Sequence, residues 1–187
     1  MEVKQAIKIR RAYRSLEPVD ITPELVKDLA ESAQLCPSCF NNQPWRFVFV
    51  YDHDMLEKLH GVMSKNNEWV QAASMIIAVF STKESDCIIK SREYHLFDTG
   101  MATAFIVLRA TELGLVAHPI AGYEEEKAEK VLSIPEEARL ITLVIVGKHS
   151  ETLGPLLTEK QAEAEKQRPE RLPVEKFVFR NTFRSQE

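Results

Sequence analysis

The segment Phe97–Leu113 constrains the fold more than any other part of this sequence. It is apolar almost all round, with small residues such as Gly100 and Ala104, and Gly114 follows it as a residue typical of the position just past a helix. A helix that is apolar on every side must be buried on every side. Because a small domain rarely encloses a helix completely, we expect Phe97–Leu113 to form the centre of a subunit interface.

Length and composition restrict the class of protein. The chain has 187 residues, 44% of them hydrophobic and 28% charged, and a formal net charge of −4. One domain over residues 1–187 is the default at this length, and the apolar fraction excludes a disordered chain. The acidic balance argues against a nucleic-acid partner, and no apolar run approaches the ~20 residues that cross a bilayer. With no signal-peptide pattern, we expect a soluble, cytoplasmic protein without membrane contact.

Helices and strands alternate irregularly along the chain, which predicts an α+β or loosely wound α/β fold. Caps and apolar spacing predict helices over Met1–Tyr13, from Thr22 to Pro37, from Asp54 to about Lys65, over Glu124–Leu132 and after Thr158. Apolar runs predict buried strands over Phe47–Tyr51, Met75–Phe80, Leu140–Val146 and Phe177–Phe179.

The C-terminal part of the chain has little to bury. Leu153–Arg171 is charged and bounded by prolines, yet an apolar run follows it. Strand exchange between protomers is a low-cost route to a dimer. We therefore expect residues from about 153 to 187 to form an arm that reaches a partner subunit.

Common catalytic and metal-binding motifs are absent from the sequence. It has no G-x-G-x-x-G, P-loop or H-E-x-x-H pattern, and its five histidines lack metal spacing. Three cysteines are too few, and odd in number, for a disulfide scaffold. Cys36-Pro37-Ser38-Cys39 has C-x-x-C form, but no further ligands match it and no strand precedes it. We expect no metal site and no redox couple between Cys36 and Cys39.

Three other segments stand out for their chemistry. Arg10–Arg14 places three guanidinium groups within five residues of an acidic protein, which favours phosphate binding through paired N–H···O bonds. Cys36–Phe47 is a polar loop between a helix and a strand, closed by Gln-Pro-Trp. Gly114–Tyr123 is rich in small residues, so we expect a loop whose backbone approaches a flat ligand closely.

Together these segments resemble the FMN-dependent nitroreductase family. Members typically begin with R-R-S-x-R, continue with a P-S-S-x-N-x-Q-P-W loop and an A-x-x-L-G-L stretch, and carry a basic residue before L-P near the end. All four motifs lie in register over nearly the whole chain. The resemblance implies a three-layer α/β/α fold with a central mixed, mainly antiparallel sheet, in a domain-swapped homodimer with FMN at the subunit interface.

The resemblance also assigns positions to FMN. The N-terminal arginines and a late arginine would hold the phosphate, the polar loop would reach the flavin of the other subunit, an amide would meet the pyrimidine edge, and the small-residue loop would pack on a ring face. In that order the matching positions are Arg10, Arg11, Ala12 and Arg171; Pro37, Ser38, Cys39 and Asn41; Asn67; and Pro119, Ile120, Ala121 and Gly122. Arg14, in the same N-terminal motif, completes the set.

Within this set, Arg14 has a particular role. It matches the basic residue beside the N1–C2=O edge of the flavin, where a fixed cation favours the reduced state. The sequence also departs from the family. Ala12 replaces a serine that donates to phosphate, Cys39 replaces the second serine of the loop, and Ala121 stands where many members have glutamate.

The implied reaction needs no catalytic side chain. Hydride would pass from NAD(P)H through flavin N5 to a nitroaromatic, quinone or similar small acceptor, in ping-pong turnover. Other readings are a flavin- or phosphate-binding protein without turnover, a regulator that keeps the fold, and a family member specialised for flavin destruction or reductive dehalogenation.

Overall fold

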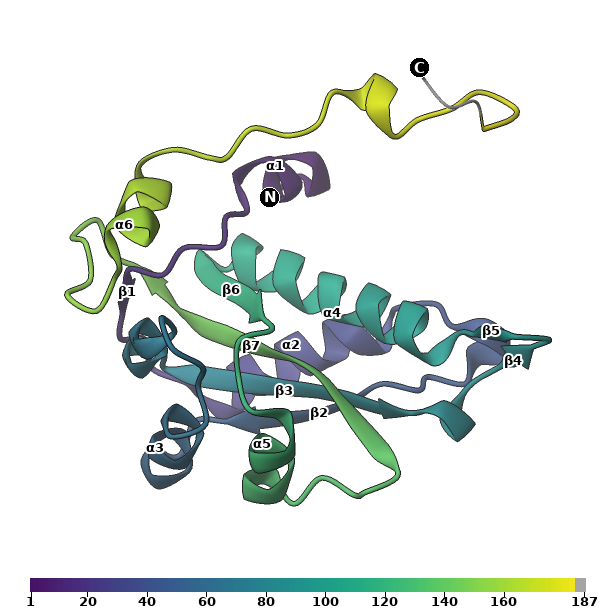
Figure 1. Ribbon diagram of the computed structural model, residues 1–187, viewed down its shortest axis with the longest axis horizontal. Helices are drawn as coiled ribbons and strands as arrows, with labels where there is room; N and C mark the ends of the chain where they lie inside the picture. The colour runs from purple at the N-terminus through teal and green to yellow at the C-terminus, as the bar shows by residue number, and fades with distance from the viewer. Residues whose placement is uncertain (184–187) are drawn as a thin grey trace.

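A five-stranded sheet forms the centre of the molecule, for which a computed structural model describes residues 1–183 (Figure 1). The strands are β1 (Leu16–Glu17), β2 (Arg46–Val50), β3 (Met75–Thr82), β4 (Ile88–Ile89), β5 (Arg92–Glu93), β6 (Leu115–Ile120) and β7 (Ala138–His149). The order is β1-β7-β3-β2, with β6 paired to β7, while β4 and β5 form a separate hairpin. Every pairing among these strands is antiparallel.

Helices cover both faces of the sheet, as Figure 1 shows. The helices are α1 (Val3–Ile9), α2 (Pro23–Gln34), α3 (His53–His60), α4 (His95–Glu112), α5 (Glu125–Leu132) and α6 (Glu159–Lys166), with 3₁₀ turns η1 (Cys39–Asn41), η2 (Glu68–Ala72), η3 (Lys83–Ser85) and η4 (Val174–Lys176). One core contains side chains of α2 and α4, and the other contains side chains of α3, η2 and α5. The three-layer α/β/α fold is confirmed. No described helix is long and apolar enough to cross a membrane.

The central strand β3 joins these two cores. Met75, Ile77 and Val79 belong to the core under α2 and α4, whereas Ile76 and Ala78 belong to the opposite core. Successive side chains of a strand point to opposite faces, so a strand covered on both sides is a continuous apolar run. The runs that predicted β3 and β7 have this cause, and both strands are confirmed.

Helices α2, α3 and α6 begin at a capping side chain. The Thr22 hydroxyl accepts a hydrogen bond from the Leu25 amide at 3.2 Å, and Thr158 and Gln161 form the predicted capping box of α6. The predicted start of α3 is wrong, because Asp52 and not Asp54 accepts from the Met55 amide, and the helix ends at His60.

Three strand predictions need correction. Phe47–Tyr51 is not fully buried, because β2 lies at the edge of the sheet and only Val50 is buried. Most of the expected loop Gly114–Tyr123 is strand β6, and its Pro119 is tolerated because β6 is an edge strand. Phe177–Phe179 is not a strand, since it follows the turn η4 with exposed side chains.

Helix α4 is buried on one side only within this chain. Ala102, Ile106 and Ala110 pack into the core, but Phe97 is 63% exposed and Phe105 is 40% exposed. The expected burial on every side is therefore not met by the single chain. That this apolar face is a subunit interface stays a prediction.

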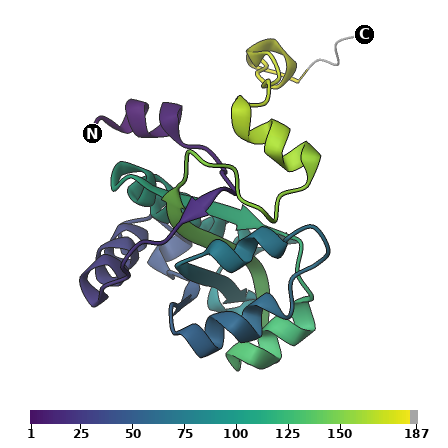
Figure 2. The same ribbon diagram turned by 90° about the vertical axis from the view of Figure 1, so that its left-hand side faces the viewer.

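Helix α1 and the described part of the chain from α6 onward lie on the same side of the molecule, away from the sheet (Figure 2). Arg168, just after α6, donates hydrogen bonds to the carbonyl oxygens of Lys8 and Arg10 at 2.7 and 2.6 Å. Leu172 and most of the described residues after it are exposed. The predicted arm over 153–187 stays a prediction, and its last four residues lie outside the described range.

Candidate functional site

A cleft lined by arginines lies between the end of α1 and the segment after α6. Its volume is about 270 Å³, and it brings together Arg10, Arg11, Ala12, Arg14, Ala164, Arg168, Pro169 and Arg171. The N-terminal and C-terminal arginines predicted for phosphate therefore meet in one place. Arg171 is 160 or more residues from Arg10 and Arg11 in sequence (171 − 11), so only the fold creates this concentration of charge.

The positive charge of the cleft is incompletely compensated. Burial lowers the pKa of Arg10 most, and the charges of Arg168 and Arg171 lower it further. The Nε atom of Arg14 is buried and has no hydrogen-bond partner among the described residues. Guanidinium groups that repel one another and lack acceptors are stabilised by a bound anion.

The buried carboxylate near the cleft is committed to the backbone. Glu165 accepts hydrogen bonds from the amides of Arg14 and Ser15 at 3.0 and 3.1 Å. This contact fixes the chain that presents the arginines. Glu165 had no signal in the sequence, because a charged helical residue ordinarily faces solvent.

Arg11 has a different role from its neighbours. Its Nη2 donates to the carbonyl oxygens of Ala164 and Glu165 at 3.0 and 3.1 Å, in the last turn of α6, and its Nη1 donates to the Tyr13 hydroxyl. A cation at a helix C-terminus satisfies free carbonyls there. Arg11 therefore fastens α6 to the N-terminal segment.

Trp69 connects three of the predicted site segments. Its Nε1 donates to Oδ1 of Asn67 at 3.0 Å, and Nδ2 of Asn67 donates to the Gly122 carbonyl at 2.8 Å. The Arg14 guanidinium lies 5.8 Å from the Trp69 ring centroid. A Cβ atom at position 122 would overlap the Asn67 amide nitrogen, so this contact requires glycine.

His118 also contacts this group. Its ring stacks on Trp69 with centroids 5.0 Å apart, and its Nδ1 donates to the Tyr13 carbonyl at 3.1 Å. Burial lowers the pKa of His118 to about 4, and the positive charges of Arg14 and Arg10 also lower it. The imidazole is therefore neutral at pH 7. The sequence indicated neither its role nor that of Trp69, because neither belongs to a spaced motif.

The small-residue segment contributes backbone and little side chain. Pro119 and Ala121 are exposed, whereas Ile120 is buried in the core that also contains Trp69. The Ile120 side chain therefore faces away from any ligand, and the predicted contact with a ring face rests on the backbone and on its neighbours.

The polar loop lies at the opposite end of α4 from the arginines. The Cys39 amide donates to Oδ2 of Asp98 in the first turn of α4 at 2.6 Å, whereas Arg10 and Arg11 share a surface pocket with Thr111 and Gly114 at its last turn. At 1.5 Å per residue, the 13 residues from Asp98 to Thr111 separate these two points of α4 by about 20 Å. Within one chain the structure does not bring the two groups together.

The loop itself is held tightly. The Ser38 hydroxyl accepts from the Gln43 amide at 2.9 Å, while Pro37 and Asn41 are exposed. Cys39 forms a disulfide with Cys87, and Cys36 is free and buried. The sequence did not predict this bond, because Cys39 and Cys87 lie 48 residues apart.

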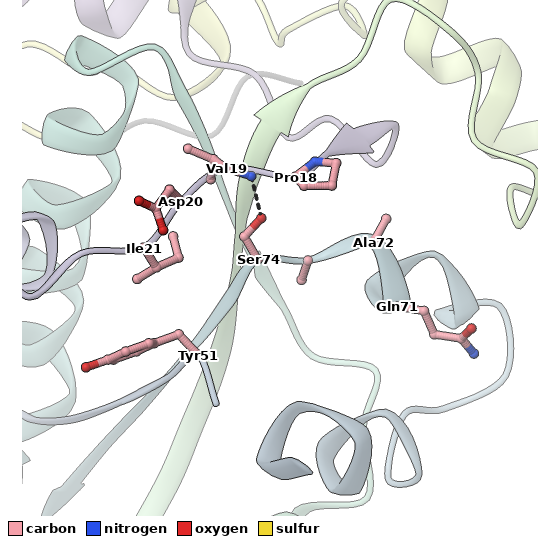
Figure 3. A pocket seen from close by; sticks show the side chains of 9 residues that line it. Pro18, Val19, Asp20, Ile21, Tyr51, Gln71, Ala72 and Ser74 are labelled. Atoms are coloured by element: carbon pink, nitrogen blue, oxygen red, sulfur yellow. Dashed lines mark hydrogen bonds between the residues drawn. The ribbon is translucent and has the colours of Figure 1, made fainter. Parts of the chain in front are cut away.

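A second pocket, of about 450 Å³, lies beside β1 and η2 (Figure 3). The Val19 amide donates to the Ser74 hydroxyl at its centre, at 2.9 Å. The one charged side chain that lines it is Asp20. A carboxylate repels phosphate, so this pocket is a poor site for an anionic cofactor.

Comparison with known proteins places the chain in a family. The model of the Nitroreductase family matches residues 7–148. A candidate NADH dehydrogenase/NAD(P)H nitroreductase of Methanothermobacter thermautotrophicus is 29% identical over 163 residues, covering 82% of this chain and 81% of that protein.

Two solved structures share the fold. A nitroreductase family protein from Clostridium novyi NT has a TM-score of 0.75 and 26% identity, and the match covers 81% of this chain and 87% of that one. An oxidoreductase containing FMN has a TM-score of 0.83 and 24% identity over 100% of this chain and 95% of that one. The resemblance found in the sequence is confirmed, and this chain belongs to the nitroreductase family.

Proposed function

We propose that the protein is an FMN-dependent oxidoreductase that transfers hydride from NAD(P)H to a nitroaromatic, a quinone or a similar small acceptor. The observation that carries the proposal is the arginine cleft, with its uncompensated positive charge and the orphaned Nε of Arg14. Membership of the nitroreductase family and the likeness to an oxidoreductase containing FMN support it.

The residues present fit a flavin phosphate. Arg10 and Arg171 would bind the phosphate oxygens through charge-assisted N–H···O bonds, with Arg168 nearby in the same cleft. Ala12 supplies no hydroxyl, so arginine carries the recognition. Arg11 contributes by holding α6, which presents the late arginines, against the N-terminal segment.

The group around Trp69 would bind the ring end. Asn67 donates to the Gly122 carbonyl and has a second N–H on its amide for a ligand. The Arg14 guanidinium lies over the Trp69 ring. A cation fixed there favours negative charge developing on the pyrimidine edge. His118 is neutral and adds no competing charge. When bound, FMN would supply the two-electron hydride chemistry, so no acid or base of the protein is required.

We further propose a cytoplasmic homodimer of single-domain protomers. The exposed apolar face of α4 supports it, and an apolar groove of about 460 Å³ between α1, α2 and α4 adjoins that face. The loop Pro37–Asn41 lies at the opposite end of α4 from the arginines of its own chain. In a dimer it would reach the flavin of the partner subunit, and residues from about 153 onward would embrace that partner.

The decisive experiment is anaerobic reduction of the FMN-loaded protein. NADH or NADPH should bleach the oxidised flavin spectrum, and a quinone or nitroaromatic should restore it. Parallel double-reciprocal plots would support ping-pong turnover. A protein that binds FMN but never bleaches is a flavin-binding or regulatory protein, which refutes the proposed activity. Failure to bind FMN refutes the cofactor assignment itself.

A further inference from the structure

The Cys39–Cys87 disulfide has no part in the proposed hydride transfer. It joins η1, in the polar loop, to the segment just before β4, across a Cα–Cα distance of 6.1 Å. The remaining cysteine, Cys36, is 3% exposed and unbonded. The molecule therefore has one defined sulfur pair, at the end of α4 that lacks the arginines.

Two buried carboxyl groups lie against this disulfide. Asp86 is 9% exposed and Asp98 is 2% exposed. The Cys39 amide donates to Asp98, and the Cys87 amide donates to Oδ1 of Asp86 at 2.8 Å. A carboxylate oxygen of Asp86 lies within 4.8 Å of both sulfur atoms, and its Oδ2 has no hydrogen-bond partner among the described residues. Each bonded cysteine thus has a buried carboxylate on its backbone amide.

One of the two carboxyl groups, Asp98, has a raised affinity for a proton. Burial raises the pKa of Asp98 most, and the nearby Asp86 carboxylate raises it further. The bond from the Cys39 amide lowers the pKa in part. A carboxyl group whose pKa is raised in this way is a potential general acid.

We propose that Cys39 and Cys87 are a reversible redox site, reduced by dithiols with the Asp86–Asp98 pair as the nearby proton donor. A dithiol thiolate attacks Sγ of Cys39, which is more exposed than Cys87. The S–S bond breaks, a mixed disulfide forms, and the departing Cys87 thiolate takes the proton of the carboxyl pair. The second thiol of the dithiol then attacks the mixed disulfide and releases Cys39.

Electrons and protons balance in this exchange. The dithiol loses two electrons and two protons and becomes a disulfide, while Cys39 and Cys87 become two thiols. The carboxyl pair regains its proton from solvent or from the dithiol. Disulfides in reducing compartments are usually transient and redox-sensing, which is the behaviour proposed for the compartment expected here.

Reduction would act on the conformation of the loop. Three residues of this loop have positive φ angles, which residues other than glycine rarely adopt: Phe40 (48°), Asn41 (59°) and Gln43 (52°). The disulfide anchors this strained stretch next to Phe40, which is 85% exposed. Because Cys39 and Asn41 belong to the positions assigned to the partner's flavin, an effect on FMN rests on the proposed function.

The first test is thiol labelling of the folded, full-length protein, and it needs no flavin. After treatment with oxidised glutathione, mass spectrometry should find Cys39 and Cys87 joined and protected from iodoacetamide. Dithiothreitol should make both reactive while the protein stays folded, and Cys36 should stay unreactive. If the pair never forms, or resists dithiothreitol until the chain unfolds, the proposal is wrong.

Variants separate the sulfur pair from its surroundings. Cys87→Ser should abolish the redox response, while Cys36→Ala, the matched control, should preserve it. Asp98→Asn keeps an acceptor for the Cys39 amide but has no carboxyl proton, so reduction should slow by about tenfold or more. An unchanged rate would remove Asp98 from the mechanism, and Asp86→Asn provides the same test if Asp98→Asn does not fold.

The second test concerns FMN. Oxidised and reduced wild-type protein should differ severalfold in FMN affinity, and the Cys36→Ala protein should show the same difference. Equal affinities would refute the link between the disulfide and the flavin. Because labelling is read without flavin, a redox site can be established even if FMN does not bind, and the two proposals can fail independently.

Discussion

The two ends of α4 differ in the sign of the charged groups that lie beside them. At the C-terminal end, arginines repel one another and one buried Nε lacks an acceptor. At the N-terminal end, two buried acids lie beside a disulfide, and burial raises the pKa of one of them, Asp98. The helix dipole suits both, because it favours Asp98 in the first turn and cations near the last. The first end requires an anion from outside, whereas the second can be satisfied internally, which distinguishes a binding site from a switch.

The largest effect is expected from the exposed face of α4 that joins these two ends. Ala104 is exposed in the single chain, so Ala104→Glu should leave the protomer's own stability nearly unchanged. In the proposed dimer the new carboxylate would be buried without a partner, at a cost of several kcal/mol. We expect a monomer with weak FMN binding in light scattering and flavin titration.

The matched control for Ala104→Glu is Ala72→Glu. Ala72 is also exposed, but it lies in η2 on the other side of the sheet. This variant should remain dimeric and loaded with FMN. A dimeric Ala104→Glu protein would contradict the proposed interface. The polar loop and the arginines would then not meet at one FMN site.

A smaller effect is expected from opening the disulfide. The bond closes a segment of 48 residues, and chain entropy predicts about 4 kcal/mol of stabilisation for a loop of that length. Cys87→Ser should lower the free energy of unfolding by up to this amount in a urea titration under oxidising conditions. Under dithiothreitol the variant and the wild type should converge, and a persistent difference would mean that Cys87 stabilises the fold by packing alone.

The arginine end should respond through ligand affinity and not through stability. Arg10→Ala removes charge-assisted bonds to phosphate that contribute roughly 1.5–3 kcal/mol, so FMN affinity should fall by about tenfold to a hundredfold. The free protein should gain or keep stability, because repulsion from Arg168 and Arg171 is relieved. Unchanged affinity in a flavin titration would remove Arg10 from the site.

Arg11→Ala is a useful comparison for Arg10→Ala. The Arg11 side chain holds the end of α6 through hydrogen bonds to Ala164 and Glu165, so the loss of these bonds should increase hydrogen exchange in α6. Arg10→Ala should leave exchange in α6 unchanged. If the two variants behave alike, the division of roles between the neighbouring arginines is wrong.

The sequence indicated the parts of the fold in which local pattern and tertiary burial agree. The runs Met75–Phe80 and Leu140–Val146 are covered on both faces, and Thr22 caps the helix after it. The sequence did not predict strand β6, because its small residues and Pro119 are typical of a loop. Pairing with β7 outweighs that local signal. Phe177–Phe179 has the composition of a strand but no strand beside it among the described residues.

The site was predictable where a motif carries it and not where distant segments meet. The arginines at both ends were identified, and the fold brings them into one cleft. The contacts of Trp69 with His118 and of Cys39 with Cys87 depend on packing between remote segments, so no local spacing encodes them. The same holds for the pairing of Asp86 with Asp98, which are twelve residues apart (98 − 86) and meet only through the loop.

The last effect appears only at low pH and concerns His118, which tests whether the arginine end stays electrostatically unsatisfied in the free protein. Its pKa in the folded state is about 4, below the ordinary value of 6.5, so the unfolded chain binds more protons between these values. Stability from this group is complete above pH 6.5 and is lost as pH falls toward 4, by up to about 1.4 kcal/mol per pH unit. His118→Gln should remove that component from urea titrations of the FMN-free protein. Bound FMN should reduce it in the wild type, because its phosphate offsets the charges of Arg14 and Arg10 and lets the His118 pKa rise; an identical slope with and without FMN would place the anion elsewhere.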